Sequence, residues 1–271
     1  YQALASAGAY RENKSIANCI GIGFRAGQII GDEGQTNTIA IGSYAGQTHQ
    51  ERDSIAIGYR AGQNTQGSLS VAIGFQAGQT NQGTESVAIG YLAGAETQNS
   101  LAVAIGHQAG QNTQGTNSIA IGHQAGQQTQ QSNAVAIGRY AGQQTQHTNA
   151  VAIGRYAGQN TQGYNGVALG AYAARTNQQN NAVALGAYSG AVDQGVYSVA
   201  VGSYAGEKTQ GSYAIAIGQN AGFRTQGSQA IAIGRKSGGE SQGEYSVAIG
   251  YLAGDFIQGT NSIAIGKQAG Q

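Results

Sequence analysis

The sequence lacks proline, methionine and tryptophan, has one cysteine, and carries charged side chains at only 9% of its 271 positions. A single cysteine excludes an internal disulfide framework. So low a charge is not typical of a disordered chain, and 46 glycines are not the composition of an average globular domain. Composition therefore favours a repetitive, β-rich and closely packed architecture.

Long apolar runs and clustered charge are also missing. The apolar runs are four or five residues long, too short to cross a bilayer, so we expect no direct membrane insertion. The net charge is +1 and the basic residues are scattered along the sequence, which predicts that nucleic acid is not a partner. Neither an initiator methionine nor a signal peptide begins at Tyr1, which indicates a piece of a longer protein.

What the sequence does contain is a repeat. A glycine that ends a short apolar run, here called the closing glycine, recurs every 16 residues, at 42, 58, 74, 90, 106, 122, 138, 154, 170, 186, 202, 218, 234, 250 and 266. An earlier run ends at Gly23, 19 residues before Gly42. One residue before each regular closing glycine stands Ile, Leu or Val, two before stands Ala, and three before stands Ile or Val.

This period predicts the fold. Sixteen residues are too few for a helical pair, which needs about 30 or more. The run "SVAIG" is short, β-branched and bounded by glycine, as in a strand, and the "AGQxTQ" half can form a second, weaker strand. We therefore predict an all-β fold, a parallel β-roll or β-solenoid whose 16-residue coils stack about 4.8 Å apart. It covers residues 19–271 in about sixteen repeats with one irregular 19-residue spacing near 23–42, after an N-terminal cap or connector at 1–18.

The strand itself is apolar on both faces. Side chains alternate across a strand, so Val87 and Ile89 share one face and Ala88 takes the other. A strand without polar residues on either face is buried on both. We expect Val and Ile to fill the interior and Ala to stay small for close approach to another copy, which makes the chain an obligate homo-oligomer. The predicted structural core comprises Val87, Ala88, Ile89, Gly90, Val247, Ala248, Ile249 and Gly250.

The units "NSIAIGHQAG", "SVAIGYLAG" and "NAVAIGRYAG" resemble the haemagglutinin-type head repeat of trimeric autotransporter adhesins, over nearly the whole chain from Cys19. The resemblance implies a left-handed β-roll, a homotrimer around a common axis, and a surface-exposed head that binds host matrix or other cells. We therefore expect an extracellular location and a partner that is host matrix, a cell-surface protein or a glycan. The resemblance also implies that aliphatic positions such as Val87 and Ile89 carry the packing. The period of 16 is longer than is usual in that family. Fibres of phages and large viruses carry similar repeats, so a virion surface is the alternative location.

Glutamine is the most regular polar residue of the repeat. It stands eight residues after the closing glycine in every unit that reaches this position: Gln50, Gln66, Gln82, Gln98, Gln114, Gln130, Gln146, Gln162, Gln178, Gln194, Gln210, Gln226, Gln242 and Gln258. We interpret this Gln ladder as stacked side-chain amides, each donating a hydrogen bond to the next. A ligand-binding role for the ladder is the alternative.

A possible ligand strip combines tyrosine and arginine in five consecutive units: Arg139, Tyr140, Arg155, Tyr156, Tyr172, Tyr188 and Tyr204. Stacked rings on a polar turn can simply cover surface. Exposed aromatic residues beside arginine are also typical of binding hot spots, so a glycan or protein would bind here first.

Other candidates are weaker. His107 and His123 occupy one position of adjacent units, about 5 Å apart in a stack, but no carboxylate or cysteine shares that position, so we predict no metal site and no cofactor. Cys19 is interpreted as a small packed residue, and Asn13 begins a glycosylation sequon. The threonines seven after the closing glycine are interrupted too often for an ice-binding array.

No acidic residue recurs with a histidine or serine partner, so we predict no enzymatic activity. Two functions remain. The first is an extracellular adhesin-like head that presents polar and aromatic ladders to a partner. The alternative is a purely structural fibre segment of a virion or an extracellular filament.

Overall fold

The computed structural model describes residues 18–30 and 37–270. The predicted N-terminal segment, apart from Asn18, and the sequon at Asn13 lie outside the described residues. The chain divides into two compact units, Tyr1–Ala134 and Val135–Gln271, and each is described by itself. Within the described residues every element is a short β-strand and none is a helix, so none could cross a membrane as an apolar helix.

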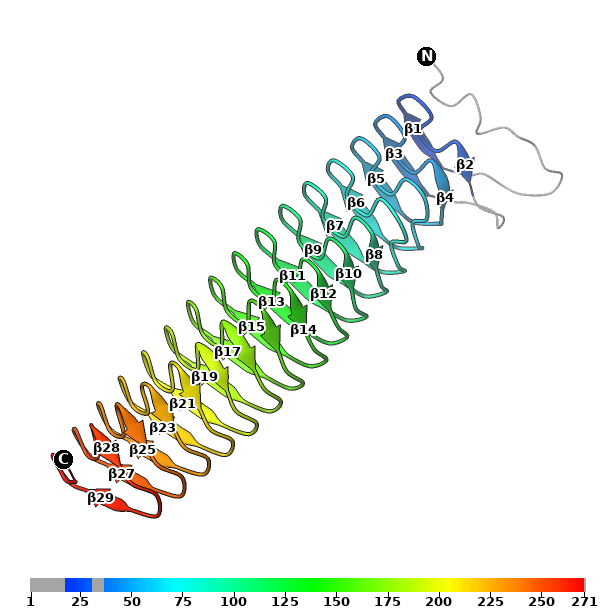
Figure 1. The fold of residues 1–271 in the computed structure, drawn as a ribbon. Helices are drawn as coiled ribbons and strands as arrows, with labels where there is room; N and C mark the ends of the chain where they lie inside the picture. Colours follow the sequence, from blue (N-terminus) through cyan, green and yellow to red (C-terminus); the bar gives the residue numbers. More distant parts are fainter. Residues whose placement is uncertain (1–17, 31–36, 271) are drawn as a thin grey trace. The chain divides into compact units, whose positions relative to one another are not determined.

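In the first unit, the strands that end just before the closing glycines form one parallel sheet: β1 (Ile20–Ile22), β3 (Ile39–Ile41), β5 (Ile55–Ile57), β6 (Val71–Ile73), β7 (Val87–Ile89), β9 (Val103–Ile105) and β11 (Ile119–Ile121). The second half of each coil forms β2 (Ile29–Ile30), β4 (Thr48–Gln50), β8 (Thr97–Gln98), β10 (Thr113–Gln114) and β12 (Thr129–Gln130). Between β4 and β8 the glutamines at 66 and 82 continue the pairing as isolated parallel bridges. Figure 1 shows the strands following one another coil by coil.

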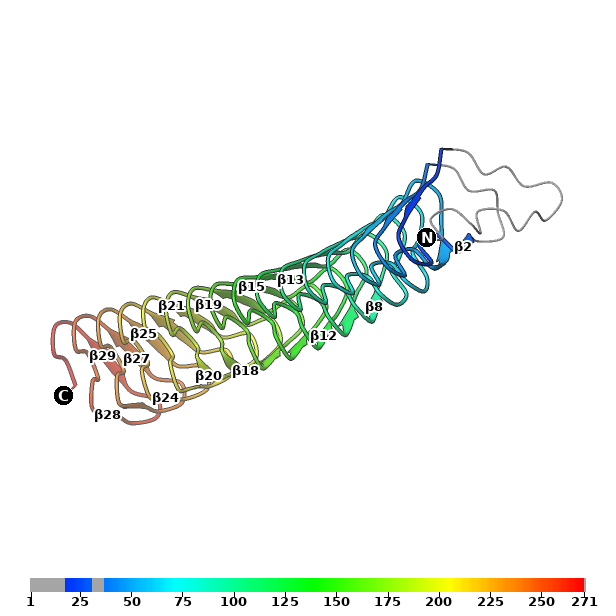
Figure 2. The same ribbon diagram turned by 90° about the horizontal axis from the view of Figure 1, so that it is seen from above.

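The second unit repeats this plan. Its first sheet contains β13 (Val135–Ile137), β15 (Val151–Ile153), β17 (Val167–Leu169), β19 (Val183–Leu185), β21 (Val199–Val201), β23 (Ile215–Ile217), β25 (Ile231–Ile233), β27 (Val247–Ile249) and β29 (Ile263–Ile265). Its second sheet contains β14 (Thr145–Gln146), β16 (Thr161–Gln162), β18 (Thr176–Gln178), β20 (Val192–Gln194), β22 (Thr209–Gln210), β24 (Thr225–Gln226), β26 (Ser241–Gln242) and β28 (Ile257–Gln258). In Figure 2, β19 and β21 lie on one side of this unit and β18 and β20 on the opposite side.

The register between coils equals the sequence period. Val71 pairs with Val87 and Ala72 with Ala88, and the same offset holds along the first sheet of both units except between β1 and β3, where Ile20 pairs with Ile39. Each coil is hydrogen-bonded on both sides: the Val87 N–H donates to the Ala102 carbonyl at 2.9 Å, and the Gly90 N–H donates to the Ile73 carbonyl at 2.8 Å. The predicted all-β, parallel β-solenoid with 16-residue coils is therefore confirmed.

Two glycines with positive φ recur along the coils, and Ala174, at φ 45°, takes the second of these positions in one coil. Gly90 has φ 131°, and a Cβ there would lie 2.6 Å from the carbonyl oxygen of Gly106 in the next coil. Gly94 has φ 53°, and a Cβ there would lie 2.9 Å from the Gln98 Oε1 atom. L-residues rarely adopt the first conformation, and the second position also faces a buried amide, so both glycines recur.

The interior of the coils corrects one expectation. Ala88 is fully buried within the coil, as are Ala93 and Gln98, whereas Val87 and Ile89 are only partly buried. The Ala face of the strand therefore points inward and the Val–Ile face points outward, the reverse of the prediction. The physical reason is width: the Gln98 Nε2 atom reaches across the coil to the Val87 carbonyl at 2.8 Å, so the space beside it holds methyl groups and not larger aliphatic side chains.

Candidate interaction surfaces

The Gln ladder lies inside both units. Every described member is at most 6% exposed, and the glutamines are the largest fully buried side chains. Gln98 is representative: its Nε2 donates to the Val87 carbonyl at 2.8 Å, to the Ala102 carbonyl at 3.2 Å and to the Gln114 Oε1 at 3.1 Å. Buried polar groups need such partners, and these bonds link the two strands of a coil and link each coil to the next. Because these amides cannot reach a partner molecule, the alternative of a ligand-binding Gln ladder is wrong.

Burial also leaves some amide oxygens without a donor. Within the described residues, the Oε1 atoms of Gln66, Gln82, Gln98 and Gln178 are buried and have no hydrogen-bond partner. The ladder is therefore satisfied at its N–H groups more completely than at its oxygens.

The outward face of the closing strand forms an aliphatic strip, defined as the Ile, Val and Leu side chains one and three residues before the closing glycine. These side chains are partly buried or exposed throughout both units. Ile105 and Leu169 are each 36% exposed and Ile217 is 38% exposed. A continuous ladder of exposed β-branched side chains is an apolar surface that a soluble protein normally covers.

The second unit carries a tyrosine–arginine strip, comprising the seven predicted strip residues and Arg175. Successive ring centroids from Tyr140 to Tyr204 lie 4.8, 5.0, 4.7 and 4.9 Å apart, with interplanar angles of 22° or less. The rings are half-buried and Arg139 and Arg155 are exposed. All the residues of the predicted strip thus lie together in one unit.

The arginines lie over these rings. The Arg139 guanidinium carbon is 4.9 Å from the Tyr140 centroid, and that of Arg155 is 4.9 Å from the Tyr172 centroid. A hydrogen bond of 3.5 Å from Arg139 Nη2 to the Tyr140 hydroxyl is the main cause that raises the pKa of Arg139. Sequence reasoning missed Arg175, whose guanidinium carbon is 5.9 Å from the Tyr172 centroid, because it stands at a different position of the repeat.

The first unit carries a second ring column, which sequence reasoning also missed. It consists of the residues directly after five successive closing glycines: Tyr59, Phe75, Tyr91, His107 and His123. Their centroids lie 5.2, 5.2, 4.9 and 4.9 Å apart, with nearly parallel planes. A comparison of ring-bearing residues at that one position, without regard to residue type, would have found it.

The structure does not strengthen His107, His123 or Cys19 as candidates for a functional site. The stacked imidazoles of His107 and His123 have centroids 4.9 Å apart, and the described residues include no group of three or more potential metal ligands. Cys19 is a partly buried free thiol.

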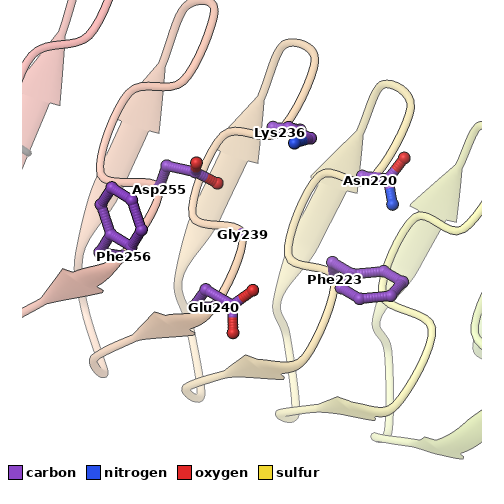
Figure 3. A pocket seen from close by; sticks show the side chains of 7 residues that line it. All are labelled: Asn220, Phe223, Lys236, Gly239, Glu240, Asp255 and Phe256. Carbon is purple, nitrogen blue, oxygen red and sulfur yellow. The ribbon is translucent and has the colours of Figure 1, made fainter.

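A notch lies on the surface of the second unit (Figure 3). Its volume is about 310 Å³, and Asn220, Phe223, Lys236, Gly239, Glu240, Asp255 and Phe256 line it. Gly239 takes the position that a phenylalanine and an aspartate hold in the neighbouring coils. Burial raises the pKa of Asp255 against the opposing effect of Lys236, and Glu240 pairs with Arg224 at 3.0 Å. Charges of both signs thus meet in this notch.

Four stretches of the chain match a known family of repeats. The family model of the YadA head domain repeat matches residues 82–109, 114–141, 179–205 and 258–269. No curated protein and no solved structure is significantly similar to the chain. The matched stretches include closing strands and Gln-ladder positions of both units. The resemblance expected from the "SVAIG" units is confirmed: these four stretches match the YadA head domain repeat, which belongs to a family of trimeric autotransporter adhesin heads.

Proposed function

We propose that the chain forms the non-enzymatic, trimeric and extracellular head of an adhesin-like surface protein. The aliphatic strip carries the proposal. It runs along both units, it contains no polar residue, and a single chain leaves it partly in water. Three copies that pack these strips around a common axis would bury it, as the YadA head repeat implies.

The strip can supply the association energy. Full burial of one Val or Ile side chain stabilises by about 1.5–3 kcal/mol, and the outward side chains of this strip are already half-buried. If each gains about 1 kcal/mol, the two outward side chains of one coil contribute about 2 kcal/mol per chain. Summed over many coils, this exceeds the cost of association.

Left-handed coils and a surface location accompany the proposal, since the family implies both. Residues 19–271 act as one repeat region and the preceding residues as a cap or connector. The partner is a host matrix component, a cell-surface protein or a glycan, and it contacts the outward ring and arginine ladders. The buried Gln ladder acts only inside the coils.

Two measurements test the proposal. Light scattering of the purified chain should give three times its mass of 27.4 kDa, and the trimer should bind saturably to immobilised matrix proteins, to glycans or to cells. A mass of one chain would overturn the trimer. A trimer that binds none of these surfaces would overturn the adhesive role and favour a purely structural fibre segment.

A further inference from the structure

All of the tyrosine–arginine strip except Tyr204 lies in a part of the chain that has no acidic residue. Residues 97–192 contain neither Asp nor Glu, and Arg139, Arg155 and Arg175 all fall within them. These arginines are far apart in the sequence, where they look scattered. The 16-residue register brings the first two to the same position of successive coils and places the third in the coil that follows. The fold thus collects cations that the sequence separates.

The three guanidinium groups are held in place by the rings. Each lies within 6 Å of a ring centroid of the strip, and within the described residues none of the three forms an ion pair. One of them, Arg175, interacts electrostatically with the carboxylate of Glu207: burial raises the pKa of Glu207, and the charge of Arg175 opposes this rise. A guanidinium over a ring keeps its in-plane N–H donors free for a second partner. The strip therefore offers ordered cationic donors, of which the Arg139 guanidinium gives one hydrogen bond to the Tyr140 hydroxyl.

We propose that this strip binds a sulfated polysaccharide, which names the ligand class of the adhesin-like function proposed above and rests on it. Coils stack about 4.8 Å apart, so the three arginines, which stand in three successive coils, are spread over about 10 Å along the coils. Arg175 stands at a different position of the repeat, but it shares the Tyr172 ring with Arg155. A linear polyanion can lay successive sulfate groups along these coils, and guanidinium binds the oxygens of an oxyanion through two parallel N–H bonds. The tyrosine hydroxyls add neutral donors for the sugar.

The same geometry disfavours nucleic acid. Single-stranded nucleic acid binds through bases that stack on free ring faces. Here the faces of Tyr156, Tyr172 and Tyr188 are covered by neighbouring rings 4.7–5.0 Å away. Binding to duplex DNA draws most of its affinity from phosphate contacts, about 6–10 in typical cases, and the strip has three arginines.

The test uses the trimeric protein and a heparin-derived oligosaccharide at about 0.15 M salt. The triple variant R139Q/R155Q/R175Q should lose affinity by about tenfold or more, because three charge-assisted contacts are removed. Arg235→Gln is the matched control. Arg235 also follows a closing glycine directly and lies 5.6 Å from the Tyr251 centroid, but Glu240 and Glu244 stand in its own repeat, so its change should alter affinity by less than about twofold.

Three outcomes would overturn the assignment: a triple variant that binds as the parent does, a desulfated oligosaccharide that binds as tightly as the sulfated one, and single-stranded DNA that binds more tightly than either. Circular dichroism must show the parent fold in each variant. Failure of the polysaccharide proposal can be distinguished from failure of the adhesin proposal. If the protein fails the polysaccharide test but keeps the trimer mass and still binds immobilised matrix, only the proposed role of the strip is refuted. Loss of binding by the parent itself to every surface would remove both.

Discussion

Replacing Gln210 by leucine tests whether the buried amides hold the coils together. The Gln210 side chain is 1% exposed, and its Nε2 donates to the Val199 carbonyl at 2.8 Å and to the Gln226 Oε1 at 3.1 Å. Leucine fills a similar volume, so the change removes the amide and opens little cavity. It deprives the buried Gln226 Oε1 of this donor and interrupts the ladder.

The expected cost follows from these contacts. Four hydrogen bonds are lost, because Nε2 also donates to the Ala214 carbonyl at 3.3 Å and Oε1 accepts from Gln194 Nε2 at 3.2 Å. Their loss at about 0.5–1.5 kcal/mol each, and the unpaired Gln226 Oε1 at about 1–3 kcal/mol, are partly offset by the more apolar side chain. We expect the free energy of unfolding to fall by about 2–5 kcal/mol. Urea denaturation followed by circular dichroism measures this, and hydrogen exchange of residues 199–226 locates it, because stacked coils can open locally.

The same substitution at an exposed glutamine is the control. Gln144 is exposed and lies two residues before the ladder, so Gln144→Leu should change the unfolding free energy by no more than about 0.5 kcal/mol. If Gln210→Leu proves as mild as Gln144→Leu, the buried amides contribute little and the reasoning is refuted.

Three further changes test other parts of the structure. Ala88→Asp places a carboxylate where the side chain is 0% exposed and should reduce the circular dichroism signal of the folded coils. Tyr91→Ser, at a ring 46% exposed, should leave the signal unchanged. An Ala88→Asp protein with the parent signal would contradict the inward orientation of the Ala face. Ile153→Asp, on the aliphatic strip, should lower the mass by light scattering from trimer to monomer while the coils persist, and an unchanged mass would refute the proposed interface. Because burial raises the pKa of Asp255, folding is penalised as the pH rises above its unfolded pKa of about 3.9. Asp255→Asn should therefore raise the melting temperature at neutral pH and leave it unchanged below about pH 3. An equal rise at both pH values would show that ionisation of the buried carboxyl is not the cause.

Much of the fold could be predicted because the same 16-residue pattern recurs in every regular coil. A closing glycine every 16 residues dictates coils of constant length, and identical side chains then pair in register, as Val71 does with Val87. The alternation of Val87, Ala88 and Ile89 also predicts that the strand has two apolar faces. Neither inference needs contacts between distant parts of the chain, because each coil repeats the same local rule.

The sequence by itself determined the period, the parallel strands, the glycine turns and the family of the repeat. Only the tertiary structure decided which apolar face points inward, because alternation separates Ala88 from Val87 but cannot tell the two sides apart. The deciding fact is the narrow interior, where the Gln98 amide spans from one strand to the other and leaves space only for alanine. The tertiary structure also placed Arg155 and Arg175 against the same ring, that of Tyr172. The two arginines stand at different positions of successive repeats, so the 16-residue period alone does not bring them together. The aliphatic strip and the tyrosine–arginine strip both lie on the outside, so they are the surfaces that a partner can contact.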